Sequence, residues 1–235
     1  VSNQGGHKLY QLFKKLKATR EQFDELTNLV GGFKSLSSNN EKVKENFIRL
    51  PKEFKPLWSN GGSIIGKHSR VYLNNRNVFN GDIIRYGMGY YTNRVIVPSY
   101  NSDGELNYFV GRDIYNGGFK YKNPPVSKDV IGFDLFINWN EPIILCEGVF
   151  DAIAIKRNAI PLFGKTIPKS LKKKIYEKKV KEIYILLDKD AISDAIKITD
   201  DLMKNGINVY FVSLSEEDPS DMGFKKVINL IKETK

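Results

Sequence analysis

The sequence predicts an α/β (α+β) protein in which a mixed, basic N-terminal subdomain precedes a domain with a mostly parallel sheet flanked by helices. Three observations predict this class. Residues 141–235 alternate between short apolar runs and helical patterns with short loops between them. Two of those apolar runs end abruptly in acidic residues. Upstream, residues 94–100 and 106–112 are typical of two strands joined by an Asp103-Gly104 turn.

The chain is expected to comprise an N-terminal helical and linker segment (1–45), a basic subdomain (46–140) and a subdomain of alternating strands and helices (141–235). A length of 235 residues allows one or two domains with a substantial core. Residues 9–16 and 21–30 have helical spacing, and Thr19 suits the N-cap of the second helix. The polar stretch 35–40 is predicted to be a linker.

Elements of the basic subdomain are less regular. A helix is expected at 70–77, with a further piece at 82–86 before two glycines. The two strands at 94–100 and 106–112 then form a hairpin. A short extended piece is expected at 119–123, because two prolines close it.

The second half has the clearest pattern. Pro168 suits the first turn of one helix, and Asn205-Gly206 suits the end of another. Right-handed crossovers would place the ends of the parallel strands on one edge of the sheet. Strands are expected at 143–146, 159–163, 183–187 and 209–213, and helices at 150–157, 168–176, 192–204 and 222–232.

Acidic residues follow the apolar runs at 143–146 and 183–187. Glu147 comes directly after the first run, and Asp188 and Asp190 follow the second. Residues two apart in a strand point to the same side, so both aspartates can face one crevice beside Glu147. Carboxylates that converge at a sheet edge repel one another, and Mg²⁺ is the cation that prefers such oxygen ligands. A helix-capping role is the alternative for Glu147.

A further acidic group lies at 216–221, after the last expected strand. Asp218 and Asp221 are candidate ligands of a second metal or, alternatively, only a turn before the last helix. Glu216 and Glu217 are expected to be solvated. Asp151, in the first turn of the helix after Glu147, is expected to complement the helix dipole rather than bind metal.

Charge and cysteine content restrict the class of partner. Lys and Arg total 37 against 27 acids, a net charge of +10, and the pI is about 9.4. This fits a phosphate-rich partner, or else a lysine-rich surface that is only solvated. Cys146 is the only cysteine, so neither an internal disulfide nor a cysteine zinc cluster can form, and His7 and His68 are expected on the surface. No apolar run approaches a membrane span. We expect a cytoplasmic protein, in the host cytoplasm if it is phage-encoded, with no membrane partner.

The acidic residues resemble the Toprim domain, which is shared by bacterial-type (DnaG-like) primases, type IA and II topoisomerases and some nucleases. The matching residues are Glu147-Gly148 after one strand, Asp188-x-Asp190 after another, and the Asp218-Pro219-x-Asp221 element common in the primase branch. The resemblance covers residues 141–235. It implies catalytic and metal-binding roles for Glu147, Asp188 and Asp190, further metal ligands at Asp218 and Asp221, and Mg²⁺ as cofactor with Mn²⁺ as a substitute.

The first half resembles the basic subdomain that precedes Toprim in bacterial-type primases. The matching stretches are RYGMGYYTNRVIVPSYNSDGELNYFVGRDI and FKYKNPPVSKDVIGFDLF. Lys120 and Lys122 flank Tyr121, which suits phosphate binding and base stacking, or alternatively an exposed strand protected by lysines. The resemblance implies that the following residues bind nucleotide or template: Arg112, Lys120, Tyr121, Lys122, Asn123 and, as a weaker match, Arg94.

Together these resemblances imply the RNA polymerase (catalytic) domain of a bacterial or phage DnaG-like primase. Such an enzyme is a nucleotidyltransferase that makes short RNA primers from ribonucleoside triphosphates on a single-stranded DNA template. The family's zinc-binding and helicase-linked regions have no match, so we expect no zinc in this fragment and a replicative helicase only through missing domains. A Toprim nuclease and a non-catalytic nucleic-acid-binding module are the alternatives.

Overall fold

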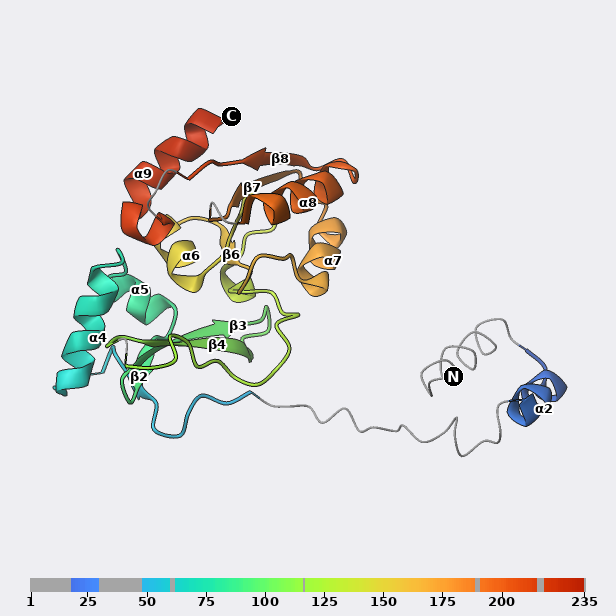
Figure 1. Ribbon diagram of the computed structural model, residues 1–235, viewed down its shortest axis with the longest axis horizontal. Helices are drawn as coiled ribbons and strands as arrows, with labels where there is room; N and C mark the ends of the chain where they lie inside the picture. The colour runs from blue at the N-terminus through green and yellow to red at the C-terminus, as the bar shows by residue number, and fades with distance from the viewer. Residues whose placement is uncertain are drawn as a thin grey trace. The chain divides into compact units, whose positions relative to one another are not determined.

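A computed structural model of the chain divides into two compact units, residues 1–47 and 48–235, which are treated separately below (Figure 1). The residues that the structure describes are 18–29, 48–59, 62–115, 117–188, 191–214 and 218–234.

The first unit contains one described helix, α2 (Arg20–Leu29). Its predicted N-cap is confirmed, because the backbone N–H of Gln22 donates to Thr19 Oγ1 (3.4 Å) and the N–H of Thr19 donates to Gln22 Oε1 (2.8 Å). These reciprocal bonds satisfy a donor that the helix itself leaves without a partner. The expected helix at 9–16 and the linker at 35–40 lie outside the described residues.

An antiparallel sheet forms the first part of the second unit. Its strands are β1 (Lys55–Pro56), β2 (Gly89–Tyr91), β3 (Arg94–Tyr100) and β4 (Leu106–Asp113), in the order β1-β2-β3-β4. The predicted hairpin joins β3 and β4, and Gly104 takes the positive φ (82°) that the turn requires. The side chain of Asn101 closes the turn by accepting from the N–H groups of Asp103 and Glu105.

Two helices, α4 (Ile64–Asn74) and α5 (Asn80–Arg85), accompany this sheet. The expected helix at 70–77 begins earlier than predicted, because Ser63 Oγ accepts from the N–H of Gly66 and starts the helix there (3.0 Å). It also ends earlier, and Asn77 has a left-handed φ of 58°. The expected extended piece at 119–123 makes one isolated bridge, between Tyr121 and Arg112 of β4.

A parallel sheet forms the second part of the unit, as predicted. Its strands are β5 (Ile143–Cys146), β6 (Ala159–Pro161), β7 (Glu182–Leu186) and β8 (Asn208–Phe211), in the order β6-β5-β7-β8. The helices between and after them are α6 (Val149–Ile155), α7 (Lys169–Glu177), α8 (Ile192–Met203) and α9 (Pro219–Thr234). The expected strand at 159–163 stops at Pro161, before Phe163 adopts a left-handed φ of 55°.

Alternate residues of the parallel strands pack into two different hydrophobic clusters. Ile144 and Leu186 join the cluster that contains residues of α6 and α9. Ile143 and Ile185 join the cluster that contains residues of α7 and α8. The sheet is therefore covered on both faces, which explains why its strands are continuous apolar runs.

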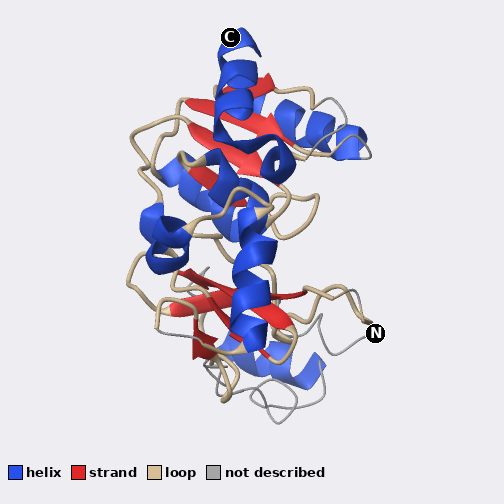
Figure 2. Cartoon of the chain, turned by 90° about the vertical axis from the view of Figure 1, so that its left-hand side faces the viewer, coloured by secondary structure: helices blue, strands red, loops and turns tan. Residues whose placement is uncertain are grey.

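The two sheets share one of these clusters, which also holds Val97 of β3 and Tyr108 of β4. The rings of Tyr108 and Phe163 lie 4.6 Å apart, and Lys174 of α7 forms a 2.6 Å ion pair with Asp134 of the short 3-10 helix Asp134–Phe136. Figure 2 shows both sheets and the helices between them. No helix in the described part of the chain is long and apolar enough to cross a membrane.

Candidate active site

Two acidic side chains lie where neighbouring parallel strands end. Glu147 follows β5 and Asp188 follows β7, and the last residues of these strands, Cys146 and Leu186, are paired in register. Both acids line one cavity of about 430 Å³. The carboxyl ends of the parallel strands thus open into a crevice, the usual place for a ligand in an open parallel sheet.

The cavity has an acidic wall and a basic wall. The acidic wall comes from the parallel half of the unit, and most of the basic wall comes from the antiparallel half and the segment after it. The charged lining residues are Glu147, Asp151, Asp188 and Asp218, called the acidic wall, and Arg76, Arg112, Lys120 and Lys128, called the basic wall. Tyr121 and Asn123 also line it.

Asp151 in the first turn of α6 belongs to this acidic wall, although the sequence analysis assigned it only to the helix dipole. Gly148 permits its approach, because a Cβ at that position would lie 2.8 Å from Asp151 Oδ2. Asp151 Oδ1 accepts a hydrogen bond from the N–H of Ser220 (3.2 Å). Burial raises the pKa of Asp151 to about 6, the Ser220 bond opposes this, and the negative charge of Asp218 adds to it.

Asp151→Asn is expected to stabilise the metal-free protein by about 1–3 kcal/mol near pH 7, with no difference below about pH 4. The folded pKa of about 6 exceeds the unfolded value, so the cost of ionising the carboxyl is absent at low pH and fully present above the folded pKa. Asparagine keeps the oxygen that accepts from Ser220. Chemical unfolding of both proteins across this pH range, with EDTA present, measures the difference. A constant difference at every pH would contradict this prediction.

The segment that carries Asp218 is fastened to the C-terminal end of α4. Arg76 Nη1 donates to Ser220 Oγ (3.1 Å), and Asn77 Nδ2 donates to the carbonyl oxygen of Ser220 (2.9 Å). Ser220 is fully buried, and Gly223 packs against the Asn77 side chain. These contacts hold the start of α9 against the antiparallel half and keep Asp218 at the cavity.

Arg112 is the buried member of the basic wall. It is only 8% exposed, and its guanidinium lies 4.9 Å from the centre of the Tyr121 ring. The segment bearing Tyr121 is bonded to β4, because the N–H of Lys122 donates to Gly111 O (2.8 Å) and Gly111 N donates to Asn123 Oδ1 (3.3 Å). β4 thus holds Arg112 and the residues of this segment together at the cavity.

Arg76 and Lys128 are lining cations that the sequence analysis did not select. Lys128 Nζ donates to the carbonyl oxygen of Phe163 (2.9 Å), which ties its loop to the residues that follow β6. Lys128 lies inside the stretch FKYKNPPVSKDVIGFDLF, so the resemblance of that stretch to the primase subdomain could have indicated Lys128 as a binding residue. Arg76 and its hydrogen-bond partner Ser220 are far apart in the sequence, so no local sequence pattern identifies Arg76 as a site residue.

Three predicted site residues do not line the cavity. Lys122 Nζ lies 6.0 Å from the centre of the Tyr91 ring. Arg94 Nη2 donates to the carbonyl oxygen of Phe119 (2.7 Å) and lies 3.6 Å from Asp113 Oδ2. This guanidinium therefore links the backbone at Phe119 to the end of β4. Asp221 lies in the first turn of α9. Asp190 lies outside the described residues.

The donor chemistry of the cavity suits a hard divalent cation. Its described lining includes carboxylates but neither histidine nor cysteine, a set that favours Mg²⁺ or Mn²⁺ over zinc. Asp151 is close enough to Asp188 and Asp218 for their charges to raise its pKa, so a cation there would relieve repulsion. Within the described ranges, no group of three or more His, Cys, Asp or Glu side chains is already arranged to hold a metal.

No protein-family model matches the chain. An uncharacterized protein of Mycoplasma genitalium, MG010, is 32% identical over 139 residues, which are 53% of this chain and 64% of that protein. This chain thus spans less than two thirds of the length of that relative.

Several solved structures have a similar fold. The Aquifex aeolicus primase (zinc-binding and RNA polymerase domains) matches with a TM-score of 0.62 and 20% identity, over 72% of this chain and 56% of that one. The RNA polymerase domain of Mycobacterium tuberculosis DnaG matches with a TM-score of 0.61 and 16% identity, over 74% and 76%. A DnaG catalytic domain bound to single-stranded DNA matches with a TM-score of 0.61 and 16% identity, over 73% and 75%.

Proposed function

We propose, from a fold shared with the DnaG primase catalytic core, that this chain is a metal-dependent nucleotidyltransferase that makes short RNA primers on single-stranded DNA. One observation carries this proposal above the others. Acids at the ends of β5 and β7 line the same cavity as Arg112 and Lys120. An acidic wall and a basic wall in one cavity suit a metal-bound polyphosphate, because the metal needs carboxylates and the phosphates need cations.

Glu147, Asp188 and Asp218 would hold the metal in this proposal. Asp190 and Asp221 stay predicted ligands, since one lies outside the described residues and the other does not line the cavity. Mg²⁺ bound there would lower the pKa of the attacking hydroxyl and offset the charge of the triphosphate. Asp151 would add negative charge beside these ligands.

The basic wall would bind and orient the substrates. Arg112 and Lys120 would hold phosphate oxygens of the nucleotide or template, and the face of Tyr121 would contact a base. The primer's 3′-oxygen would then form its bond to the α-phosphorus of the incoming nucleotide. The bond from that phosphorus to pyrophosphate breaks, and the proton of the hydroxyl leaves to solvent.

Asp188→Ala is expected to lower primer synthesis at least about 100-fold, because it removes a carboxylate from the proposed metal site. The assay supplies single-stranded DNA, ribonucleoside triphosphates and Mg²⁺ or Mn²⁺, and it measures oligoribonucleotides on a gel. Asp103→Ala is the matched control, since Asp103 is an exposed acid in the hairpin turn. Undiminished synthesis by folded Asp188→Ala would reject the site.

The same preparation separates the alternatives. Cleavage of labelled DNA with metal and without nucleotides, lost in Asp188→Ala, would indicate a nuclease. Metal-independent binding of single-stranded DNA, with neither synthesis nor cleavage, would indicate a nucleic-acid-binding module. A replicative helicase partner and the choice of start site stay predictions.

A further inference from the structure

The ring of Phe119 is the most exposed large hydrophobic side chain in the described part of the protein, at 87%. Single apolar residues on a surface are common and need no explanation by themselves. Phe119 differs because it is next to Lys120 and two residues before Tyr121, and both of these residues line the cavity.

The backbone that directly follows the Phe119 side chain is fastened by two hydrogen bonds. Arg94 Nη2 donates to the carbonyl oxygen of Phe119 (2.7 Å). The N–H of Asp113 then donates to the carbonyl oxygen of Lys120 (3.1 Å). The chain is therefore held to β3 and β4 at residues 119 and 120, while the ring of Phe119 is exposed to solvent.

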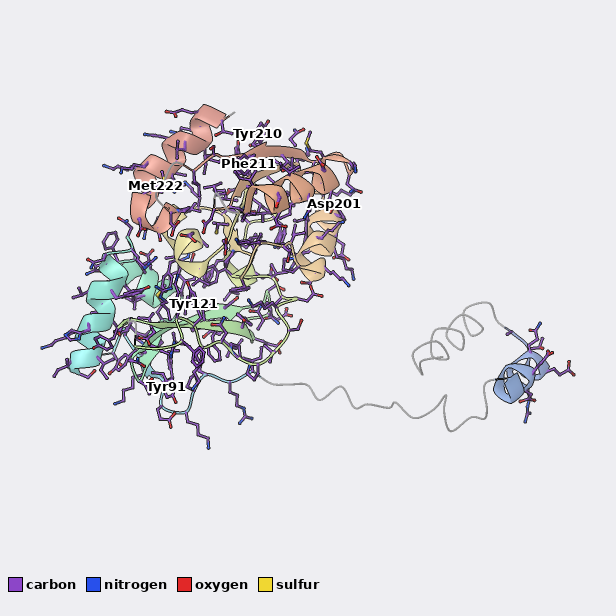
Figure 3. The ribbon with its side chains drawn as sticks, viewed as in Figure 1. Tyr91, Tyr121, Asp201, Tyr210, Phe211 and Met222 are labelled. Atoms are coloured by element: carbon purple, nitrogen blue, oxygen red, sulfur yellow. The ribbon has the colours of Figure 1, made fainter. Side chains whose placement is uncertain are left out.

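The neighbouring side chains are of the kind that binds single strands. Tyr121 is 46% exposed, and Lys120 Nζ lies 5.8 Å from the centre of its ring. Figure 3 shows Tyr121 between the antiparallel sheet and α6, with Tyr91 lower in the same view. The surface from Phe119 to the cavity thus alternates aromatic rings with cations, and such surfaces bind bases and phosphates in turn.

We propose that Phe119 stacks on an unpaired nucleobase of the strand that enters the cavity. This inference rests on the proposed function, because it assumes that a single strand reaches Tyr121 and Arg112. Every base presents a π face, so the stacking would be tolerant of sequence. Fastening the backbone beforehand reduces the entropy lost when the base binds.

The first test compares a short oligothymidylate with an abasic strand that has the same number of phosphates. Phe119→Ala is expected to weaken binding of oligothymidylate by about 5- to 150-fold and to leave binding of the abasic strand nearly unchanged. Its salt dependence should match that of the wild type, because no charge is removed. Lys120→Gln should instead weaken both strands and reduce the salt slope by about one.

The matched control is Ile84→Ala, which removes another strongly exposed apolar side chain (65%) that does not line the cavity. It should bind both strands as the wild type does. The midpoints of thermal unfolding of both alanine variants should equal that of the wild type, since neither the Phe119 ring nor the Ile84 side chain is packed in the core.

A second variant reports contact directly. The added fluorescence of Phe119→Trp should be quenched by oligothymidylate and not by the abasic strand, after subtraction of the signal of Trp58 and Trp139 in the wild type. Phe211→Trp, on the edge strand β8, should show no such quenching. Restored affinity in Phe119→Trp would separate a stacking role from a merely structural one.

Two results would overturn the inference in different ways. If the wild type binds oligothymidylate but Phe119→Ala binds it equally well, Phe119 stacking is wrong and the proposed function stands. If the wild type binds neither strand, the proposed function and this inference both fail.

Discussion

Arg112→Ala is expected to lower the rate of primer synthesis about 100- to 1,000-fold, the usual cost of removing one charged group that stabilises a transition state. Arg112 is the buried cation of the basic wall, and it lines the same cavity as Glu147 and Asp188. A charge that is largely removed from water acts more strongly on a nearby phosphate than a surface charge does.

The unused hydrogen-bond donor of the Arg112 side chain supports this expectation. Its Nε is buried and has no hydrogen-bond partner among the described residues. Buried donors are nearly always bonded, so a donor of this kind beside a cavity suits a ligand that completes it. The guanidinium lies 4.9 Å from the centre of the Tyr121 ring, and its planar pair of donors suits two oxygens of one phosphate.

Arg112→Lys is expected to recover only part of the rate, because lysine keeps the charge but lacks the planar donor pair. Arg157→Ala, which removes an exposed arginine that does not line the cavity, is the control and should synthesise primers normally. Initial rates at saturating nucleotide and template measure the effect. A folded Arg112→Ala that keeps the wild-type rate would remove this residue from the site.

The acidic strand ends could be predicted from sequence because their causes are local. Four consecutive apolar residues before Glu147 require a strand buried on both faces, and the same holds before Asp188. Right-handed connections then place both ends on one edge. The structure pairs these two strands directly, so periodicity and handedness were enough to bring the acids together.

Other parts of the site depend on contacts between distant residues. The place of Asp151 depends on the missing Cβ of Gly148 and on a donor from Ser220, 69 residues away. The place of Arg76 depends on Ser220, which is 144 residues away. Neither contact leaves a periodic pattern, so a helix-dipole role was the best local interpretation for Asp151 and Arg76 was not selected.

The segment at 119–123 shows the same limit. Its composition predicted an extended piece with alternating cations, and it does lie along β4 through the bridge between Arg112 and Tyr121. Sequence could not show that this brings Lys120 and Tyr121, but not Lys122, to the cavity.

Gly111→Ala is expected to destabilise the fold by about 1–3 kcal/mol, the usual cost of overpacking a buried position. A Cβ at this position would lie 2.4 Å from the carbonyl oxygen of Lys122 and 3.3 Å from Ile96 Cδ1. A side chain can rotate away from a clash, but the Lys122 carbonyl is part of the backbone. The segment at 119–123 must therefore move off β4.

The same movement should weaken binding of single-stranded DNA at least about fivefold, because Lys120 and Tyr121 would leave the cavity and a lost stacking contact alone costs at least that much. Gly117→Ala makes the same change two residues before this segment, but its Cβ would meet nothing within 4 Å, so stability and binding should stay as in the wild type. Urea unfolding and strand titration measure the two effects. Since both come from one displaced segment, weaker binding without lower stability, or the reverse, would mean that β4 does not position the basic wall through Gly111.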